Sequence, residues 1–285
     1  MFPEALNISI RKPVNDLVQE LVANYGFVFK EISQVILKAI LFFEWVLRGL
    51  PWWAIFALFL ALAWISCRRI GMVIIVGVLL LVVGALGLWD LTMQTLALML
   101  MATALAVIIG IPIGIWVAKS NMMRRIILPV LDVMQTMPSF VYLIPAIMLF
   151  GLGKVPAVLA TIVYAVPPLI RLTDLGIRQV DAEVVEAATA FGARPRQILF
   201  GVELPLALPT IMAGLNQTIM MALSMVVVAS MIGARGLGEQ VLNGIQTLDV
   251  GRGLEAGIGI VILAIVLDRI TQGFGQAAQK GQNNG

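Results

Sequence analysis

The stretch EAATAFGARPRQILFGVELP, residues Glu186–Pro205, is a polar interval between two long apolar segments. The residues from Asp181 to Ala190 are rich in alanine and acidic at their start, which favours a short helix because carboxylates stabilise the positive end of the helix dipole. Gly192 can adopt the left-handed conformation that ends a helix, and Pro195 suits the first turn of the next one. We therefore predict a helix, a tight turn and a second helix. By spacing alone, this unit could be a docking knob for a partner's groove or a well-formed linker.

The apolar segments around this interval decide the fold class. The chain has 285 residues, 60% of them hydrophobic and 12% charged, with a mean hydropathy of +1.00. Soluble domains carry roughly 25% charged residues. The uncharged runs are near or above the roughly 20 residues that cross a bilayer; they are Gly49–Cys67, Ile70–Trp89, Leu91–Ala118, Val133–Gly153 and Leu204–Ala234. We predict an all-α polytopic membrane protein.

The pattern indicates about seven transmembrane helices of roughly 20 residues. They are expected near residues 50–66, 70–89, 92–117, 126–153, 155–170, 205–232 and 253–270. Proline and glycine recur in the third to fifth spans, and broken backbone at membrane depth is tolerated where it is buried in protein or lines a water-filled cavity. This favours a transporter core over a passive anchor, although prolines are also more frequent in membrane helices generally.

The segment before the first span is different. Residues 1–26 are mixed and polar and are interpreted as a tail. In Phe27–Gly49 the polar side chains fall on one arc of a helix; they are Lys30, Glu31, Gln34, Lys38, Glu44 and Arg48. This predicts an amphipathic helix, lying either on the membrane surface, in contact with lipid, or against a neighbouring part of the same complex.

Positive charges orient the chain. One set of loops holds Arg68, Arg69, Lys119, Arg124, Arg125, Arg171, Arg178, Arg194, Arg196, Arg269 and Lys280, and the other holds only Lys154, Arg235 and Arg252. Because lysine and arginine concentrate in cytoplasmic loops, we predict that the amino terminus lies outside the cell and that the carboxyl terminus and the Glu186 loop are cytoplasmic. The formal net charge of +3 fits anchoring and orientation, so no nucleic-acid partner is expected.

The chain lacks the residues that several kinds of function would require. The chain has no histidine and one cysteine, Cys67, so we expect no catalytic residue, no metal site and no cofactor. No G-x-x-x-x-G-K-[ST] sequence is present to hold ATP phosphates. An ion-coupled secondary transporter would need carboxylates near mid-membrane, and the uncharged runs contain none. Asp132 and Asp268 lie near span ends, where structural pairing or capping is the favoured interpretation.

Four motifs together resemble one family. They are Glu186-Ala187-Ala188 with Gly192 and Val202-Glu203-Leu204-Pro205; the stretch MQTMPSFVYLIP at 134–145; Leu149-Phe150-Gly151; and IGARGLG at 232–238. The first is similar to the EAA motif of permease subunits of binding-protein-dependent ABC importers, departing only in Val202 where the motif has isoleucine. The others resemble the glycine betaine, proline betaine and choline branch of that family. The resemblance covers about Leu91–Ile270.

The resemblance implies a type I importer permease core at residues 91–272 with a coupling loop at 181–205. Residues 1–49 would form the extracytoplasmic tail and interfacial helix, 50–90 two accessory spans, and 273–285 a cytoplasmic polar tail. It further implies a permease homodimer in the bacterial cytoplasmic (inner) membrane, a separate cytoplasmic ATPase and an extracytoplasmic solute-binding protein. The residues expected to couple to the ATPase are Glu186, Ala187, Ala188, Gly192, Arg194, Arg196, Leu204 and Pro205. For the two arginines, simple anchoring is at least as good an explanation.

Residues that meet the solute are harder to place. A quaternary ammonium ion favours aromatic faces, which makes Phe140, Tyr142 and Tyr164 candidates, although membrane aromatics often only pack. On the sixth span one helix face holds Thr210, Gly214, Gln217, Met221 and Ser224. Because lipid would penalise the Gln217 amide, that stripe should face the pathway, a second subunit or another helix. Solute choice among choline, glycine betaine, proline betaine and carnitine is expected to rest with the binding protein; another small amino-acid-like solute stays possible.

Overall fold

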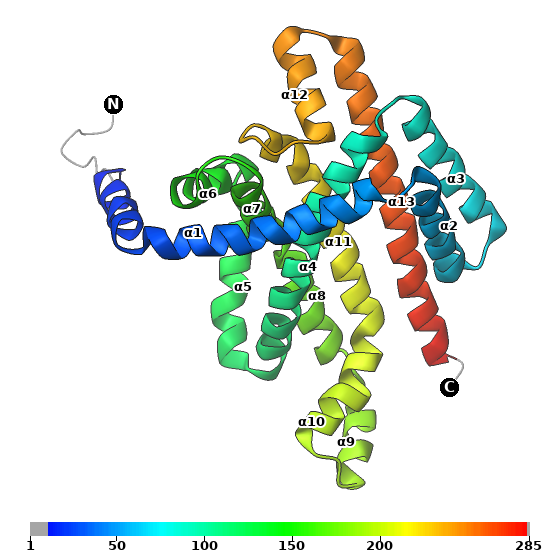
Figure 1. The fold of residues 1–285 in the computed structure, drawn as a ribbon. Coiled ribbons are helices and arrows are strands. Elements are labelled where there is room, and N and C mark those ends of the chain that lie inside the picture. The colour runs from blue at the N-terminus through cyan, green and yellow to red at the C-terminus, as the bar shows by residue number, and fades with distance from the viewer. Residues whose placement is uncertain (1–10, 284–285) are drawn as a thin grey trace, which may run out of the picture.

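The structure is a computed structural model that describes residues 11–283, apart from the side chains of 277, 278 and 280–283. Within these residues every regular element is a helix, which confirms the predicted fold class (Figure 1). In chain order the elements are α1 (Arg11–Gly49), α2 (Trp52–Cys67), α3 (Ile70–Ala85), α4 (Trp89–Lys119), α5 (Asn121–Thr136), the 3₁₀ turn η2 (Ser139–Tyr142), α6 (Leu143–Phe150), α7 (Lys154–Ala165), α8 (Pro167–Arg178), α9 (Ala182–Ala190), α10 (Pro195–Ile198), the π-helical turn η3 (Leu199–Glu203), α11 (Leu204–Ser230), α12 (Leu237–Thr247) and α13 (Val250–Asn283).

The centre of the molecule is built from α4, α8 and α11, which approach one another closely. A Cβ on Gly114 of α4 would lie 2.5 Å from the Thr173 Cβ of α8, and a Cβ on Gly214 of α11 would lie 3.0 Å from the Leu172 Cβ. Small residues allow membrane helices to pack at short range, where van der Waals contact and not the hydrophobic effect holds them together. These contacts make α8 the middle helix of the core.

The structure does not confirm the predicted number of about seven spans exactly. Four helical stretches are long and apolar enough to cross a membrane, and they are Trp89–Lys119, Lys154–Arg178, Pro195–Ser230 and Val250–Gln276. The number rises to six if each of two bent helix pairs counts as one span, and α3 is a shorter apolar helix. The predicted fifth span therefore runs on through α7 and α8 to Arg178.

The predicted fourth span is not one straight helix. α5 and the segment Ser139–Phe150 meet at an angle of 110° across the break at residues 137 and 138. Pro138 causes the break, because proline disfavours a helical conformation for Met137 before it and has no N–H to continue the hydrogen-bond ladder. The result is a broken span or a re-entrant loop.

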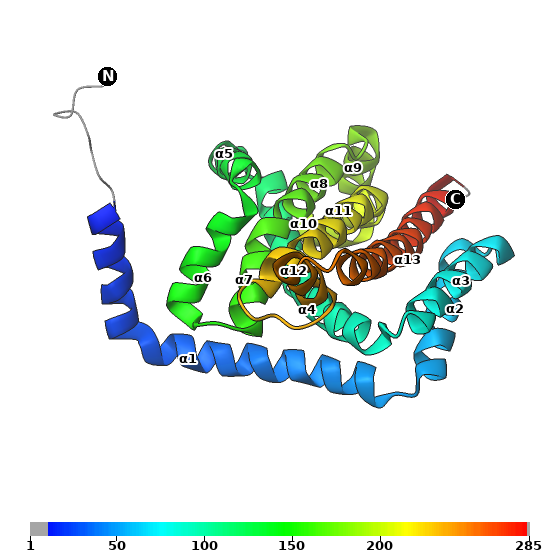
Figure 2. The same cartoon turned by 90° about the horizontal axis from the view of Figure 1, so that it is seen from above.

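The first helix is longer than predicted. α1 starts at Arg11 instead of Phe27, so residues 11–26 are helical and not an irregular tail; residues 1–10 lie outside the described part. It turns by 102° into α2 at Gly49–Pro51. α1 crosses the long helices at a steep angle (Figure 1). Seen from above, it follows one side of the molecule (Figure 2), where it contacts α4, α6 and α7.

At its carboxyl end, α13 continues helically through 273–283, where the sequence indicates only a polar tail. In Figure 1, α9 and α10 lie at the lower end of the molecule and α12 lies at the upper end. The polar interval at 181–205 and the α12 region are therefore the two extremities of the molecule.

Candidate functional site

The hairpin of α9 and α10 has the predicted form of helix, turn and helix. Asp181 caps α9 by accepting a hydrogen bond from the Glu183 N–H at 2.9 Å. Gly192 has φ +79°, and a Cβ there would meet nothing within 4 Å, so glycine is required by conformation and not by space. Pro195 opens α10, whose start is held by the Arg194 N–H donating to Gln197 Oε1 at 2.8 Å. Because the sequence predicts that this segment couples to an ATPase, we call residues 181–198 the coupling hairpin.

The coupling hairpin is joined to the membrane helices without a flexible linker. α10, η3 and α11 form one helical stretch from Pro195 to Ser230. Its π-helical turn contains Glu203, which is only 7% exposed and accepts a hydrogen bond from Lys119 Nζ at 2.6 Å. π-helical turns in α-helices are frequent at functional sites. The hairpin, α11 and the end of α4 are therefore directly connected.

A second ion-pair group fixes the helix ends beside Lys119. Asp174 on α8 is 2% exposed and accepts from Arg124 Nε at 3.1 Å and from Arg178 Nε at 2.8 Å. Arg178 also donates to the Val117 carbonyl at 3.1 Å. Two arginines thus satisfy the buried carboxylate, and the bond from Arg178 to the Val117 carbonyl adds α4 to the contact between α5 and α8. Asp132 pairs with Arg171, and Asp268 accepts from Asn216 Nδ2 at 2.9 Å, so both carboxylates have structural partners.

The residues predicted to couple to an ATPase lie mostly on the surface of this end. α9 has no buried residue, and Ala188 and Leu204 are half-buried. The exposed ones are Glu186, Ala187, Gly192, Arg194, Arg196 and Pro205. Sequence reasoning missed Phe191, which is 93% exposed at the hairpin turn, and Phe200, which is 66% exposed. Their position inside a polar interval was the available signal, because an aromatic residue in such a loop often anchors a partner.

The opposite end is built from IGARGLG and α12, an element that sequence reasoning did not predict because it is short and amphipathic. Gly236 has φ +139°, and its Cβ would lie 2.5 Å from Thr95 Oγ1. That buried hydroxyl oxygen accepts a hydrogen bond from the Leu237 N–H at 2.9 Å, at the start of α12. The Gly153 N–H donates to the Ile232 carbonyl at 2.8 Å, which joins the loop before α7 to the same motif.

The candidate solute residues do not form one group. Tyr142 and Tyr164 are neighbours, with ring centroids 6.2 Å apart, and the Tyr142 hydroxyl donates to the Met134 carbonyl. Phe140 is exposed on η2. On α11, Thr210 and Gly214 face α8, whereas Gln217 and Ser224 are exposed and Met221 is half-buried. Gln217 borders a groove of about 320 Å³ between α11 and α13, together with Asn216 and Thr271.

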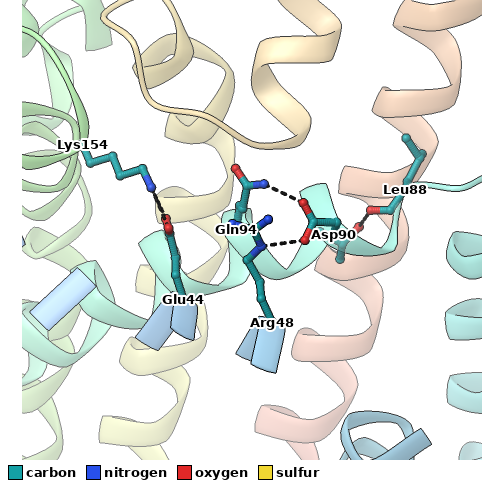
Figure 3. A network of polar contacts seen from close by, with 7 residues as sticks. Glu44, Arg48, Leu88, Asp90, Gln94 and Lys154 are labelled. Atoms are coloured by element: carbon teal, nitrogen blue, oxygen red, sulfur yellow. Dashed lines mark hydrogen bonds and ion pairs between the residues drawn. The ribbon is translucent and has the colours of Figure 1, made fainter. Parts of the chain in front are cut away.

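Two ion pairs attach α1 to the rest of the chain (Figure 3). Lys154 Nζ donates to Glu44 Oε2 at 2.6 Å, and both side chains are largely buried. Arg48 Nε donates to Asp90 Oδ1 at 2.6 Å, and Asp90 also accepts from Gln94 at 2.9 Å. The first pair reaches α7, and the second reaches the start of α4. α1 thus packs on its own chain, while Phe27, Val35 and Trp45 stay exposed and available to lipid.

Among the described residues, no group of three or more His, Cys, Asp or Glu side chains could hold a metal ion. What the geometry offers is a polar hairpin rigidly connected to close-packed membrane helices.

The fold and the hairpin define a multi-pass helical membrane protein of the transport class. Residues 110–280 match the family of binding-protein-dependent transport system inner membrane components. The glycine betaine/proline betaine transport system permease protein ProW of Escherichia coli (strain K12) is 48% identical over 95% of this chain and 76% of its own length. The glycine betaine/carnitine transport permease protein GbuB of Listeria monocytogenes serotype 1/2a is 47% identical over 97% and 99%.

Among solved structures, an inward-facing conformation of the MetNI methionine ABC transporter superposes with a TM-score of 0.58 at 23% identity, covering 65% of this chain and 93% of that one. This likeness supports the fold alone. The chain belongs to the family of binding-protein-dependent transport system inner membrane components. It is thus a permease subunit of an ABC importer, and its role is transport and not catalysis.

Proposed function

We propose that this permease imports glycine betaine or a closely related quaternary ammonium solute. The observation that carries the proposal is the near-complete alignment with two permeases whose names include glycine betaine, at 47–48% identity. The half-buried ring of Tyr164, packed beside the buried Tyr142, is the kind of aromatic group that attracts a quaternary ammonium ion. Phe140, Gln217, Met221 and Ser224 remain candidates for the pathway that a second copy of the chain completes.

The coupling hairpin docks into a separate cytoplasmic ATPase. Glu186, Ala187, Ala188 and Gly192 set its shape, Phe191 is the apolar anchor, and Arg194 and Arg196 supply polar contacts. ATP binding brings the two hairpins of a permease homodimer together, and α11 and α4 follow because Glu203 and Lys119 connect them. ATP can drive transport only through a difference in affinity between the two conformations. The outer end, with α12, receives solute from an extracytoplasmic binding protein.

The test is reconstitution of the permease with its ATPase and binding protein in proteoliposomes. We expect uptake of labelled glycine betaine that needs ATP, with choline, proline betaine and carnitine compared in the same assay. Deletion of residues 186–192 should abolish uptake while the permease still inserts and stays monodisperse. Uptake driven by an ion gradient without ATP would instead establish a secondary transporter, and import of only a non-ammonium amino acid would overturn the solute class.

Charge reversal across one contact tests the mechanical connection. Lys119→Glu should lower the solute imported per ATP hydrolysed, because it places two carboxylates side by side in a half-buried site. The double variant with Glu203→Lys should recover a large part of that ratio. Arg125→Gln is the matched control, since Arg125 is an exposed cation on α5, close to the end of α4. An unchanged ratio in Lys119→Glu would contradict the proposed route.

A further inference from the structure

We infer that the pocket beside the α2–α3 turn binds the headgroup of an anionic phospholipid. The pocket has a volume of about 240 Å³ and is lined by both sides of the turn and by α13. Its lining includes Arg68, Arg69 and Arg269, which we call the arginine pocket. The inference concerns lipid and does not depend on which solute the permease carries.

The arginine pocket has a fixed frame. Cys67 Sγ donates to the Arg269 carbonyl at 3.7 Å, so the end of α2 rests on α13. A Cβ on Gly273 would lie 2.5 Å from Cys67 Sγ and 2.8 Å from Ser66 Oγ. Such a close approach leaves the two helices little freedom to separate. The three arginines are therefore held near one another by packed backbone.

The charges of the arginine pocket are not neutralised within the chain. Among the side chains that the structure describes, no ion pair or hydrogen bond involves the guanidinium groups of Arg68, Arg69 or Arg269. By contrast, Arg124, Arg171 and Arg178 all pair with aspartates. Guanidinium groups match the geometry of phosphate oxygens by donating two parallel hydrogen bonds. Three unpaired guanidinium groups around one pocket indicate an anionic ligand with phosphate oxygens.

The backbone of the turn adds to this preference. α3 is a 16-residue helix that begins at Ile70, directly after Arg69, and no side chain caps its first amides. An uncapped helix amino terminus attracts anions through its free N–H groups and the helix dipole. Arg68 has φ +49°, a left-handed conformation that is uncommon for a residue with a side chain. The turn places the two arginines next to that helix terminus.

The surroundings favour a lipid phosphate over a free one. Ile65 on α2 is 59% exposed, and Ile70 and Ile74 on α3 are 68% and 59% exposed. Ile65 lines the arginine pocket, and Ile70 and Ile74 lie in the first turns of the helix that follows Arg69, so a bound phosphate would sit where acyl chains can cover these side chains. Basic pockets between membrane helices on the cytoplasmic side bind anionic headgroups. General anchoring by positive charge, in contrast, predicts no saturable site.

Native mass spectrometry of the full-length permease with added lipid tests this inference. We expect one phosphatidylglycerol molecule to bind saturably per chain, and phosphatidylcholine with the same acyl chains to bind at least about fivefold more weakly. Arg68→Gln, Arg69→Gln and Arg269→Gln should each lower phosphatidylglycerol affinity by about fivefold, from the electrostatic contribution of one arginine near a membrane surface. Arg125→Gln, an exposed arginine outside the pocket, should leave affinity unchanged.

Three results would overturn the inference. Equal loss in Arg125→Gln and in the pocket variants would show diffuse attraction, and equal binding of phosphatidylcholine would remove the need for net negative charge. Displacement of phosphatidylglycerol by inorganic phosphate at micromolar concentration would assign the pocket to a soluble anion. The thermal midpoint of each variant is measured alongside; Arg269 lies on the surface within a long helix, so Arg269→Gln decides the outcome if a turn variant unfolds.

Discussion

Single residues with an unusual backbone conformation or exposure shape the coupling hairpin. Gly192 is one of them, because it ends α9 with a positive φ at a place where a side chain would meet no neighbour. Phe191 beside it is the opposite case, a large apolar side chain left 93% exposed. Together they give the coupling hairpin its sharp turn and the exposed apolar side chain that we propose as the anchor for the ATPase.

Replacing Gly192 by alanine should weaken coupling, because a side chain in the left-handed conformation costs about 1–2 kcal/mol. We expect affinity for the ATPase to fall roughly fivefold or more, measured by titrating labelled ATPase onto the permease in nanodiscs. Gly192→Asn should lose less, since asparagine tolerates this conformation. Gly201→Ala is the matched control: it is a glycine near the hairpin with equal free space and no positive φ. Equal loss in both alanine variants would contradict a conformational origin.

Pairs of elements are held by contacts of two kinds, close glycine packing in the core and ion pairs at the edge. α1 shows the second kind, with one buried pair, Glu44–Lys154, and one exposed pair, Arg48–Asp90 (Figure 3). These pairs differ in energy because a buried charge without its partner cannot be solvated, whereas an exposed one can.

Lys154→Met should detach α1, because it leaves Glu44 buried and unpaired at a cost on the order of 3 kcal/mol. The thermal midpoint should fall, and limited proteolysis should cut between α1 and α2. The double variant with Glu44→Met should recover stability, since two apolar side chains can replace a buried ion pair. Arg48→Gln should change the thermal midpoint little, because the side chains of Arg48 and its partner Asp90 are 47% and 56% exposed. Failure of the double variant to recover would mean that the ion pair itself is needed.

Packing between α4 and α8 should tolerate no added atom at Gly114. Gly114→Ala puts a Cβ against Thr173, which is fully buried, and should cost about 1–3 kcal/mol by overpacking. A lower thermal midpoint in detergent is the expected result. Gly84→Ala on α3 serves as the control, because a Cβ there meets nothing within 4 Å and alanine favours the helix. A wild-type midpoint in Gly114→Ala would contradict this account of the core.

At the scale of the whole molecule, the two ends differ in structure, and we propose a different partner for each. The coupling hairpin lies at one end and α12 at the other, with the close-packed helices between them (Figure 1). The positive-inside rule predicts that the hairpin is cytoplasmic. Both ends carry exposed positions that suit labelling, Phe191 in the hairpin and Val250 at the start of α13.

Cysteine labelling should confirm this orientation. In a Cys67→Ser background, Val250→Cys should react with a membrane-impermeant maleimide in right-side-out vesicles. Phe191→Cys should react only in inside-out vesicles, and bound ATPase should protect it. Both positions are at least 81% exposed, so poor access within the protein would not explain a negative result. The reverse labelling pattern would require the opposite topology.

The sequence by itself determined the helical membrane class, the family and the form of the coupling hairpin. Uncharged runs of sufficient length permit few alternatives in a bilayer, and the hairpin is specified by local signals at Asp181, Gly192 and Pro195. Only the tertiary structure decided the break near Pro138, the existence of α12 and the length of α1 and α13. It also decided that Gly214 faces α8 while Gln217 is exposed, and that Arg68, Arg69 and Arg269 line one pocket. The physical reason is that hydropathy and capping act within a few residues, whereas these features depend on which distant helices come into contact.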